Sequence, residues 1–211
     1  MSVLQFIASQ QGRQDDVPNQ ELAKRLVDQS DAEGIREIVD NLDHPEKAVQ
    51  SDCIKVLYEV GYLEPRLIAP YWRIFLNLLD HKNNRLVWGG MIALSTIAQI
   101  KADELYTHLQ TIKDAVQRGS VITQDSGIRT LSGIAASQEN YRKDILPDLF
   151  DFLRMCRTKD VPRHAEIMLI ALDAEHAADF IAVIKAREPE MTSNQRKKAE
   201  KILKKVEKLF S

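Results

Sequence analysis

The segment GMIALSTIA (residues 90–98) returns 37 positions later as GIRTLSGIA (residues 127–135), with small and apolar residues in matching places. Three apolar columns keep the same step of 37 along the chain. They are Ile35, Trp72, Leu109 and Leu146; Ile38, Phe75, Ile112 and Leu149; and Leu42, Leu79, Val116 and Leu153. The spacing of i, i+3 and i+7 within each unit puts its members on one face of a helix. The sequence therefore predicts a tandem repeat of helices.

Each repeat also predicts a second helix, marked by two further apolar columns. These columns are Leu57, Leu94, Leu131 and Leu169, and Val60, Ile97, Ile134 and Leu172. Turn and helix-start signals separate the two helices of each unit. The signals are Asp43-His44-Pro45, residues 80–84, Arg118-Gly119-Ser120 and Asp160-Val161-Pro162. Because one helical hairpin cannot bury its inner face alone, the hairpins are expected to stack around a continuous apolar core.

Gly90 and Trp88 interrupt an otherwise ordinary amphipathic stretch. Gly90 falls in a column that otherwise holds Cys53, Gly127 and Ala165, and a column of small residues predicts close approach of helices. No glycine-rich phosphate-binding string is present to support a ligand loop instead. Trp88 falls in a polar column, so the repeat predicts an exposed indole that could anchor a partner. The alternative is that a local irregularity tucks the indole over a neighbouring side chain.

Composition and charge favour a helical protein without an unspecific affinity for nucleic acid. The chain is 44% apolar and 6% aromatic, and its formal net charge is -2. The charge is uneven, since residues 187–211 carry eight Lys and Arg against four Glu. A final helix is predicted there, capped by Thr192 or Ser193, with Ala199, Ile202, Val206 and Leu209 on its apolar face. Its lysine-rich face is expected to protect the end of the stack, with a patch for an acidic partner or nucleic acid as the alternative.

The sequence offers no pattern for catalysis or metal binding. Cys53 and Cys156 are far apart and are predicted to be buried free thiols. The two Asp-His pairs (43–44 and 80–81) fall at turns, where the Asp carboxylate is expected to accept backbone N–H groups. No nucleophile–base set can be assembled, so no catalytic residue, metal or cofactor is predicted. A start without signal-peptide features and the lack of a long apolar run predict a cytoplasmic protein with no membrane segment.

The period, the paired helices and the string ILPDLFDFL (residues 145–153) resemble HEAT and armadillo-type repeat proteins. The segments GMIALSTIA and GIRTLSGIA resemble the second-helix pattern of that family. The resemblance implies an all-α, right-handed α-α superhelix of about five helix pairs. It also implies one solenoid domain, with residues 1–30 as an N-terminal cap, 31–186 as the repeats and 187–211 as a C-terminal capping helix.

The same resemblance implies a non-enzymatic scaffold that binds a polypeptide partner on the concave face lined by the second helices. The side chains expected to contact the partner are Asp52, Lys55, Glu59, Trp88, Ile92, Thr96, Asp125, Arg129 and Arg163. A nucleic-acid-binding or DNA glycosylase-like repair protein, or a lyase-type repeat protein, is the alternative function. The negative repeat body argues against nucleic acid. The pattern leaves the partner's identity and the oligomeric state open.

Overall fold

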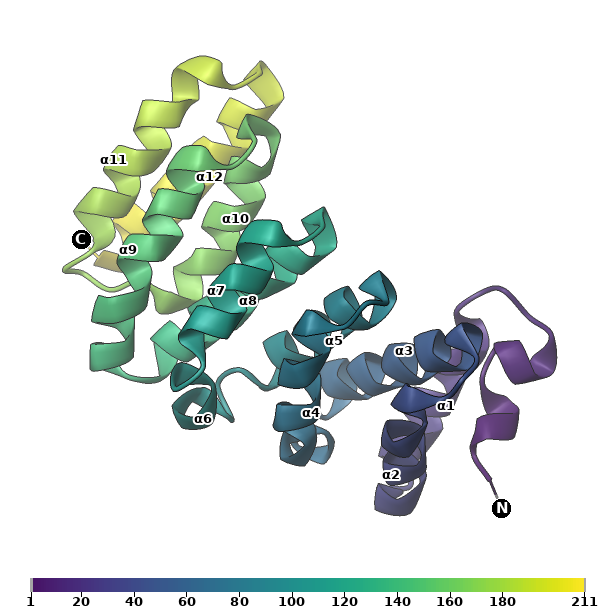
Figure 1. The fold of residues 1–211 in the computed structure, drawn as a ribbon. Coiled ribbons are helices and arrows are strands. Elements are labelled where there is room, and N and C mark those ends of the chain that lie inside the picture. Colours follow the sequence, from purple (N-terminus) through teal and green to yellow (C-terminus); the bar gives the residue numbers. More distant parts are fainter. Residues whose placement is uncertain (1, 211) are drawn as a thin grey trace. The chain divides into compact units, whose positions relative to one another are not determined.

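The computed structural model describes residues 2–210, which form helices and turns with no β-strand in that range. The chain divides into two compact units, unit 1 (Met1–Thr130) and unit 2 (Leu131–Ser211), and helix α8 crosses the division (Figure 1). The α-helices of unit 1 are α1 (Val17–Asp28), α2 (Ala32–Asp40), α3 (Lys47–Leu63), α4 (Trp72–Asn77), α5 (Asn84–Ile97), α6 (Ala102–Tyr106), α7 (Leu109–Arg118) and the first part of α8 (Val121–Ser137). Those of unit 2 are the end of α8, α9 (Glu139–Met155), α10 (Val161–Met168), α11 (Ala177–Arg187) and α12 (Ser193–Phe210).

Short 3-10 helices extend or connect these elements. They are η1 (Leu4–Phe6), η2 (Ser9–Gln11), η3 (Asn41–Asp43), η4 (Pro65–Leu67), η5 (Ala69–Tyr71), η6 (Leu78–Asp80), η7 (Thr158–Asp160), η8 (Leu169–Ala171) and η9 (Glu188–Glu190). Within the described range, none of the helices has the length and apolar character needed to cross a membrane.

The helices form five pairs, in agreement with the about five that the resemblance to HEAT and armadillo-type proteins implies: α2 with α3, α4 with α5, α7 with α8, α9 with α10, and α11 with α12. In unit 1, α1 packs on α3, which is the second helix of the first pair, α3 packs on α5, and Met91 of α5 contacts Thr130 of α8. We call this succession of α1, α3, α5 and α8 the B row (Figure 1). The all-α repeat fold is confirmed, while the division into one domain with two caps stays a prediction.

The apolar columns form the core, as the period predicts. Ile38, Phe75, Ile112 and Leu149 occupy the central column and are all buried, as are Leu57 and Leu94 in the second helices. Trp72, Leu109 and Leu169 are only half-buried. Trp72 instead stacks against the His108 ring, with 5.7 Å between ring centroids. The columns therefore fix which face of each helix is buried, with local adjustment at three positions.

Gly90 packs closely against the preceding helix, as its column of small residues predicts. A Cβ at this position would lie 2.9 Å from Cβ of Leu78 and 3.0 Å from the carbonyl oxygen of Phe75. At Gly127, one repeat later, a Cβ would lie 2.2 Å from Cγ2 of Val116. These separations are shorter than carbon van der Waals contact, so glycine allows the close approach of the helices in the pairs α4–α5 and α7–α8.

The turns before α3 and α5 use histidine rather than aspartate as the acceptor. Nδ1 of His44 accepts a hydrogen bond from the backbone N–H of Glu46 at 3.1 Å, and Nδ1 of His81 accepts one from Asn83 at 2.9 Å. The predicted turn role of the Asp-His pairs is correct, but the predicted acceptor is wrong. The imidazole takes it because its ring nitrogen reaches the N–H two residues ahead, in the manner of an Asx turn.

The N-terminal segment is fastened to α3 by one carboxylate. Asp52 accepts a hydrogen bond from the backbone N–H of Ser9 at 2.8 Å and another from Nδ2 of Asn19 at 2.8 Å. Oδ1 of the buried Asn19 accepts in turn from the N–H of Ala8 at 3.0 Å. Residues that precede the regular repeats are thus tied to the first full hairpin by polar side chains.

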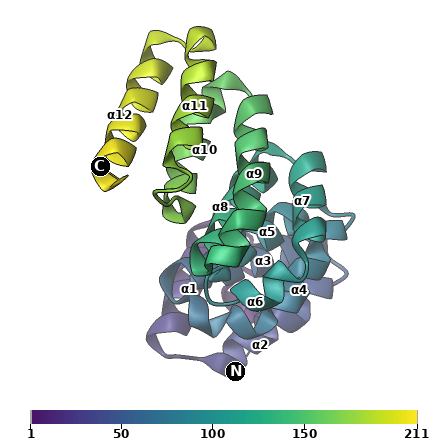
Figure 2. The ribbon, with the colours of Figure 1, turned by 90° about the vertical axis from the view of Figure 1, so that its left-hand side faces the viewer.

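Unit 2 contains α9 to α12 packed as two successive pairs (Figure 2). Arg187, at the end of α11, is buried and donates hydrogen bonds to three main-chain carbonyl oxygens at the end of α9. The acceptors are Leu153 at 2.7 Å, Arg154 at 2.6 Å and Cys156 at 3.0 Å. A guanidinium at a helix C-terminus satisfies carbonyls that have no partner within the helix and complements the helix dipole.

The final helix begins and packs largely as its sequence predicts. Thr192 and Gln195 cap α12 reciprocally, since the N–H of Thr192 donates to Oε1 of Gln195 at 2.8 Å. Ala199, Ile202 and Val206 are buried, as predicted. Leu209 is 62% exposed, so its assignment to the apolar face is wrong.

Candidate functional site

Three aromatic side chains gather on the B row of unit 1. The Tyr58 ring of α3 lies between the rings of Tyr62 and Trp88, with centroid distances of 6.0 Å and 6.1 Å. Tyr62 is 57% exposed, Trp88 is half-buried and Tyr58 is buried. Tyr58 therefore acts as a rigid support with one partly open aromatic ring on either side of it.

Trp88 is neither fully exposed nor covered. Its ring leans on Tyr58, so the structure favours the alternative in which the indole is tucked over a neighbour above the exposed indole that the repeat predicts. The other side of the ring lies near the guanidinium of Arg85, 6.0 Å from the ring centroid. The indole thus keeps an accessible part beside a cation, a combination that suits recognition.

Lys55 of α3 pairs with Asp16 at the start of the N-terminal helix α1, and its side chain is only 12% exposed. Its ammonium lies 2.7 Å from Glu59 and 3.1 Å from Asp16, and 5.0 Å from the centroid of the Tyr58 ring. Burial by itself lowers the pKa of Lys55, but hydrogen bonds to Glu59, Tyr58 and Asp16 outweigh it and raise the pKa above its usual value. Lys55 is therefore a permanent charge that is already neutralised within the protein.

Arg129 supplies a second cation beside the aromatic group. Burial raises the pKa of the Tyr62 phenol, and the positive charge of Arg129 partly offsets this rise. Arg129 is exposed, and no carboxylate among the described residues pairs with it or with Arg85. Two arginines without acidic partners thus flank two partly open aromatic rings.

We call this set of side chains the aromatic–arginine surface, and its members are Tyr58, Tyr62, Arg85, Trp88 and Arg129. Of the residues predicted from sequence, it contains Trp88 and Arg129, and Lys55 and Glu59 support its edge. Sequence reasoning missed the two tyrosines and Arg85. One signal for the tyrosines was available, because Tyr58 and Tyr62 stand at positions where the next repeat has Ser95 and Gln99.

Other predicted contact residues serve the fold instead. Ile92 is 8% exposed, so the prediction that it faces a partner is wrong. Thr96 is half-buried against Gly61, where a Cβ would lie 2.3 Å from its Oγ1. Asp52 holds the N-terminal segment. Asp125 is half-buried, and its contact with a partner stays a prediction. Ile92 and Thr96 lie one and two turns beyond Trp88 on the same face of α5, so the packing around this face, and not its direction, decides how far each side chain is covered.

Arg163 lies in unit 2, on α10, and is hydrogen bonded to Asp160 at 2.9 Å. It belongs to a different part of the chain from the aromatic–arginine surface. Among the described residues there is no group of three His, Cys, Asp or Glu side chains placed to hold a metal ion. Cys53 is a buried free thiol, as predicted, whereas Cys156 is free but only half-buried, so the prediction of its full burial is wrong. Desolvation raises the pKa of Cys53 to about 12 and that of Cys156 to about 11, which keeps both thiols protonated.

Solved structures that resemble this chain are helical repeat proteins. A computationally designed armadillo repeat protein for modular peptide recognition matches over 96% of this chain and 97% of its own, with 13% identity and a TM-score of 0.65. A designed armadillo repeat protein in complex with the peptide (KR)4 matches over 87% of this chain and 85% of its own, with 13% identity and a TM-score of 0.64.

Kap121p bound to Pho4p matches over 95% of this chain, with 15% identity and a TM-score of 0.63, and this chain spans 22% of Kap121p. No protein-family model matches the chain, and no curated protein does. The chain has an armadillo/HEAT-type helical repeat fold, and at these identities the likeness establishes the fold alone.

Proposed function

We propose that this protein is a non-enzymatic scaffold that binds a polypeptide segment on the aromatic–arginine surface of unit 1. The observation that carries the proposal is the pairing of open aromatic faces at Tyr62 and Trp88 with arginines that lack acidic partners. Tyrosine, tryptophan and arginine are the residues most often found at the energetic centre of protein interfaces. The proposal gains support from structural neighbours that were designed for peptide recognition or that hold a bound peptide or protein.

The surface favours a particular kind of segment. An apolar or aromatic side chain of the partner can rest on the rings of Tyr62 and Trp88, and a carboxylate can form a bidentate pair with Arg85 or Arg129. Residues 1–130 contain 14 Lys and Arg against 18 Asp and Glu, which disfavours a phosphate backbone on this unit. The expected ligand is therefore a segment that combines an aromatic residue with an acidic one, in contrast to the basic (KR)4 peptide of the designed neighbour.

The test begins with selection of peptides from a random display library on the intact chain. Trp88→Ala should weaken a selected peptide by at least about 30-fold, because truncation of a central aromatic anchor costs about 2 kcal/mol or more. The matched control is Trp72→Ala, since Trp72 is also half-buried, also contacts one ring and also has an arginine nearby, at 5.0 Å.

Trp72 lies on α4, outside the B row. An affinity that falls equally in Trp72→Ala and Trp88→Ala would show that the loss comes from destabilisation, and the surface would be rejected. Selection of peptides that bind Trp88→Ala as tightly as the unmodified chain would reject it as well. Circular dichroism of both variants establishes that the helices are intact.

A further inference from the structure

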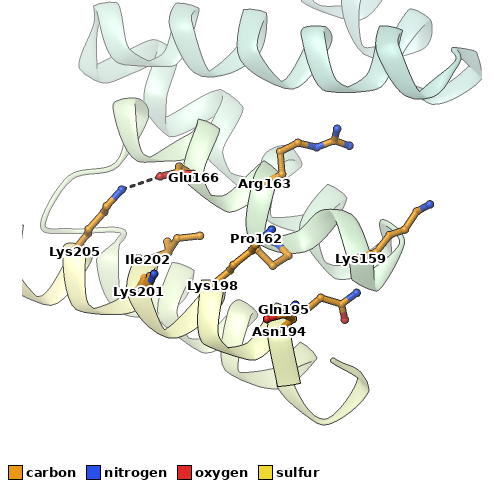
Figure 3. Close-up of a pocket in the computed structure, with 10 residues that line it drawn as sticks. All are labelled: Lys159, Pro162, Arg163, Glu166, Asn194, Gln195, Lys198, Lys201, Ile202 and Lys205. Atoms are coloured by element: carbon orange, nitrogen blue, oxygen red, sulfur yellow. Dashed lines mark hydrogen bonds and ion pairs between the residues drawn. The ribbon is translucent and has the colours of Figure 1, made fainter. Parts of the chain in front are cut away.

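A basic groove runs between α10 and α12 in unit 2 (Figure 3). It has a volume of about 470 Å³ and is floored in part by Pro162 and Ile202. Five cationic side chains and one anionic side chain line it: Lys159, Arg163, Lys198, Lys201, Lys205 and Glu166. A hollow with this excess of positive charge holds a local potential that attracts anions.

The charges of the groove are only partly balanced by the protein itself. Glu166 pairs with Lys205 at 2.7 Å, and Arg163 pairs with Asp160 at 2.9 Å. Lys159, Lys198 and Lys201 have no carboxylate partner among the described residues and are exposed. Three ammonium groups with no partner around one hollow repel each other, and a bound anion would relieve that repulsion.

The lysines of α12 are distributed in a way that a simple solvated end does not require. Lys198, Lys201 and Lys205 follow i, i+3 and i+7 spacing and form one stripe beside α10. The two acidic residues of the helix, Glu200 and Glu207, do not line the groove. A helix that only caps the end of a stack needs polar residues of either sign. The absence of acidic α12 residues from the groove is therefore not explained by capping.

We propose that the groove between α10 and α12 is a second binding site, which takes an acidic polypeptide segment. None of its lining residues is aromatic, so it lacks the stacking faces that single-stranded nucleic acids use. Its apolar floor can accept side chains, and the amides of Asn194 and Gln195 at one end can hydrogen bond to a peptide backbone. The site lies in another unit and differs in chemistry from the aromatic–arginine surface, so it does not depend on the proposed function.

The experiment measures fluorescence anisotropy of a labelled octapeptide of alternating Glu and Ala, titrated with the full chain at low and at physiological salt. The decisive variant is Lys198→Glu/Lys201→Glu. Its matched control is Lys197→Glu/Lys204→Glu, which makes the same change of charge at exposed positions of the same helix that do not line the groove. Octapeptides of alternating Lys and Ala and an oligothymidylate of equal length serve as competing probes.

We expect the acidic octapeptide to bind, with an affinity that falls as salt rises. The groove variant should weaken it by at least about tenfold, because two attractive contacts become repulsive, and the control variant by less than about threefold. Equal losses in both variants would mean diffuse attraction to the helix and would overturn the site. The site would also be overturned if the unmodified chain failed to bind the acidic octapeptide or bound oligothymidylate more tightly. The same holds if light scattering showed a dimer that the groove variant abolishes.

Discussion

Replacement of Arg187 by alanine tests whether one buried guanidinium holds unit 2 together. The side chain is 10% exposed and donates to the carbonyls of Leu153, Arg154 and Cys156 at 2.7, 2.6 and 3.0 Å. Hydrogen bonds from a charged donor contribute about 1.5–3 kcal/mol each, and they are not additive because water can reach part of the vacated space. We therefore expect Arg187→Ala to lower the free energy of unfolding by about 3–4 kcal/mol.

The pair with Glu190 adds little to that figure. Glu190 lies 3.0 Å from the guanidinium but its side chain is 54% exposed, so solvent screens the attraction. The pKa of Glu190 is lowered by its hydrogen bonds from Arg187 and Thr158. Glu190→Gln should accordingly destabilise the protein far less than Arg187→Ala does. Arg187→Lys should fall between the two other variants, because an ammonium keeps the charge but cannot reach all three carbonyls.

The assay is urea unfolding followed by far-UV circular dichroism and by tryptophan fluorescence. Both tryptophans, Trp72 and Trp88, lie in unit 1, so fluorescence reports that unit while circular dichroism reports the helices of both. Lys185→Ala is the control, since Lys185 is exposed on the same helix. A change of less than about 1 kcal/mol in the dichroism transition of Arg187→Ala, or one no larger than that of Lys185→Ala, would refute the reasoning.

Three further outcomes are expected. Gly90→Ala should lower the free energy of unfolding in urea by up to about 2 kcal/mol, because overpacking against the backbone of Phe75 outweighs the gain of about 1 kcal/mol in helix propensity. A stabilised variant would contradict this. Asp52→Ala should speed proteolysis of residues 9–16 in the otherwise folded chain, whereas an unchanged cleavage rate would show that the carboxylate does not hold the segment. Cys53 and Cys156 should react slowly with a thiol reagent at pH 8 until urea unfolds the chain, because a pKa of about 11 leaves only about a thousandth of a thiol ionised at that pH. Rapid labelling of the native protein would exclude such a pKa.

The aromatic–arginine surface was only partly predictable. The repeat placed Trp88 and Arg129 on the second helices, where the structure has them, and it named Lys55 and Glu59 at the edge. It could not reveal that Tyr58 supports both neighbouring rings, because that arrangement depends on how α3 and α5 are rotated against each other. The burial of Ile92 depends on the same packing.

The period of 37 and its apolar columns were sufficient to determine the class of fold, four of the five helix pairs and the buried face of most helices. This holds because helical periodicity and the need to bury one face are local properties that a single sequence displays. The environment of individual polar residues was decided only by the tertiary structure. Arg187 belongs by sequence to a basic, solvated end, yet it is buried, because α11 places it against the last carbonyls of α9. Contacts between residues distant in the chain set burial and charge pairing, and no local pattern encodes them.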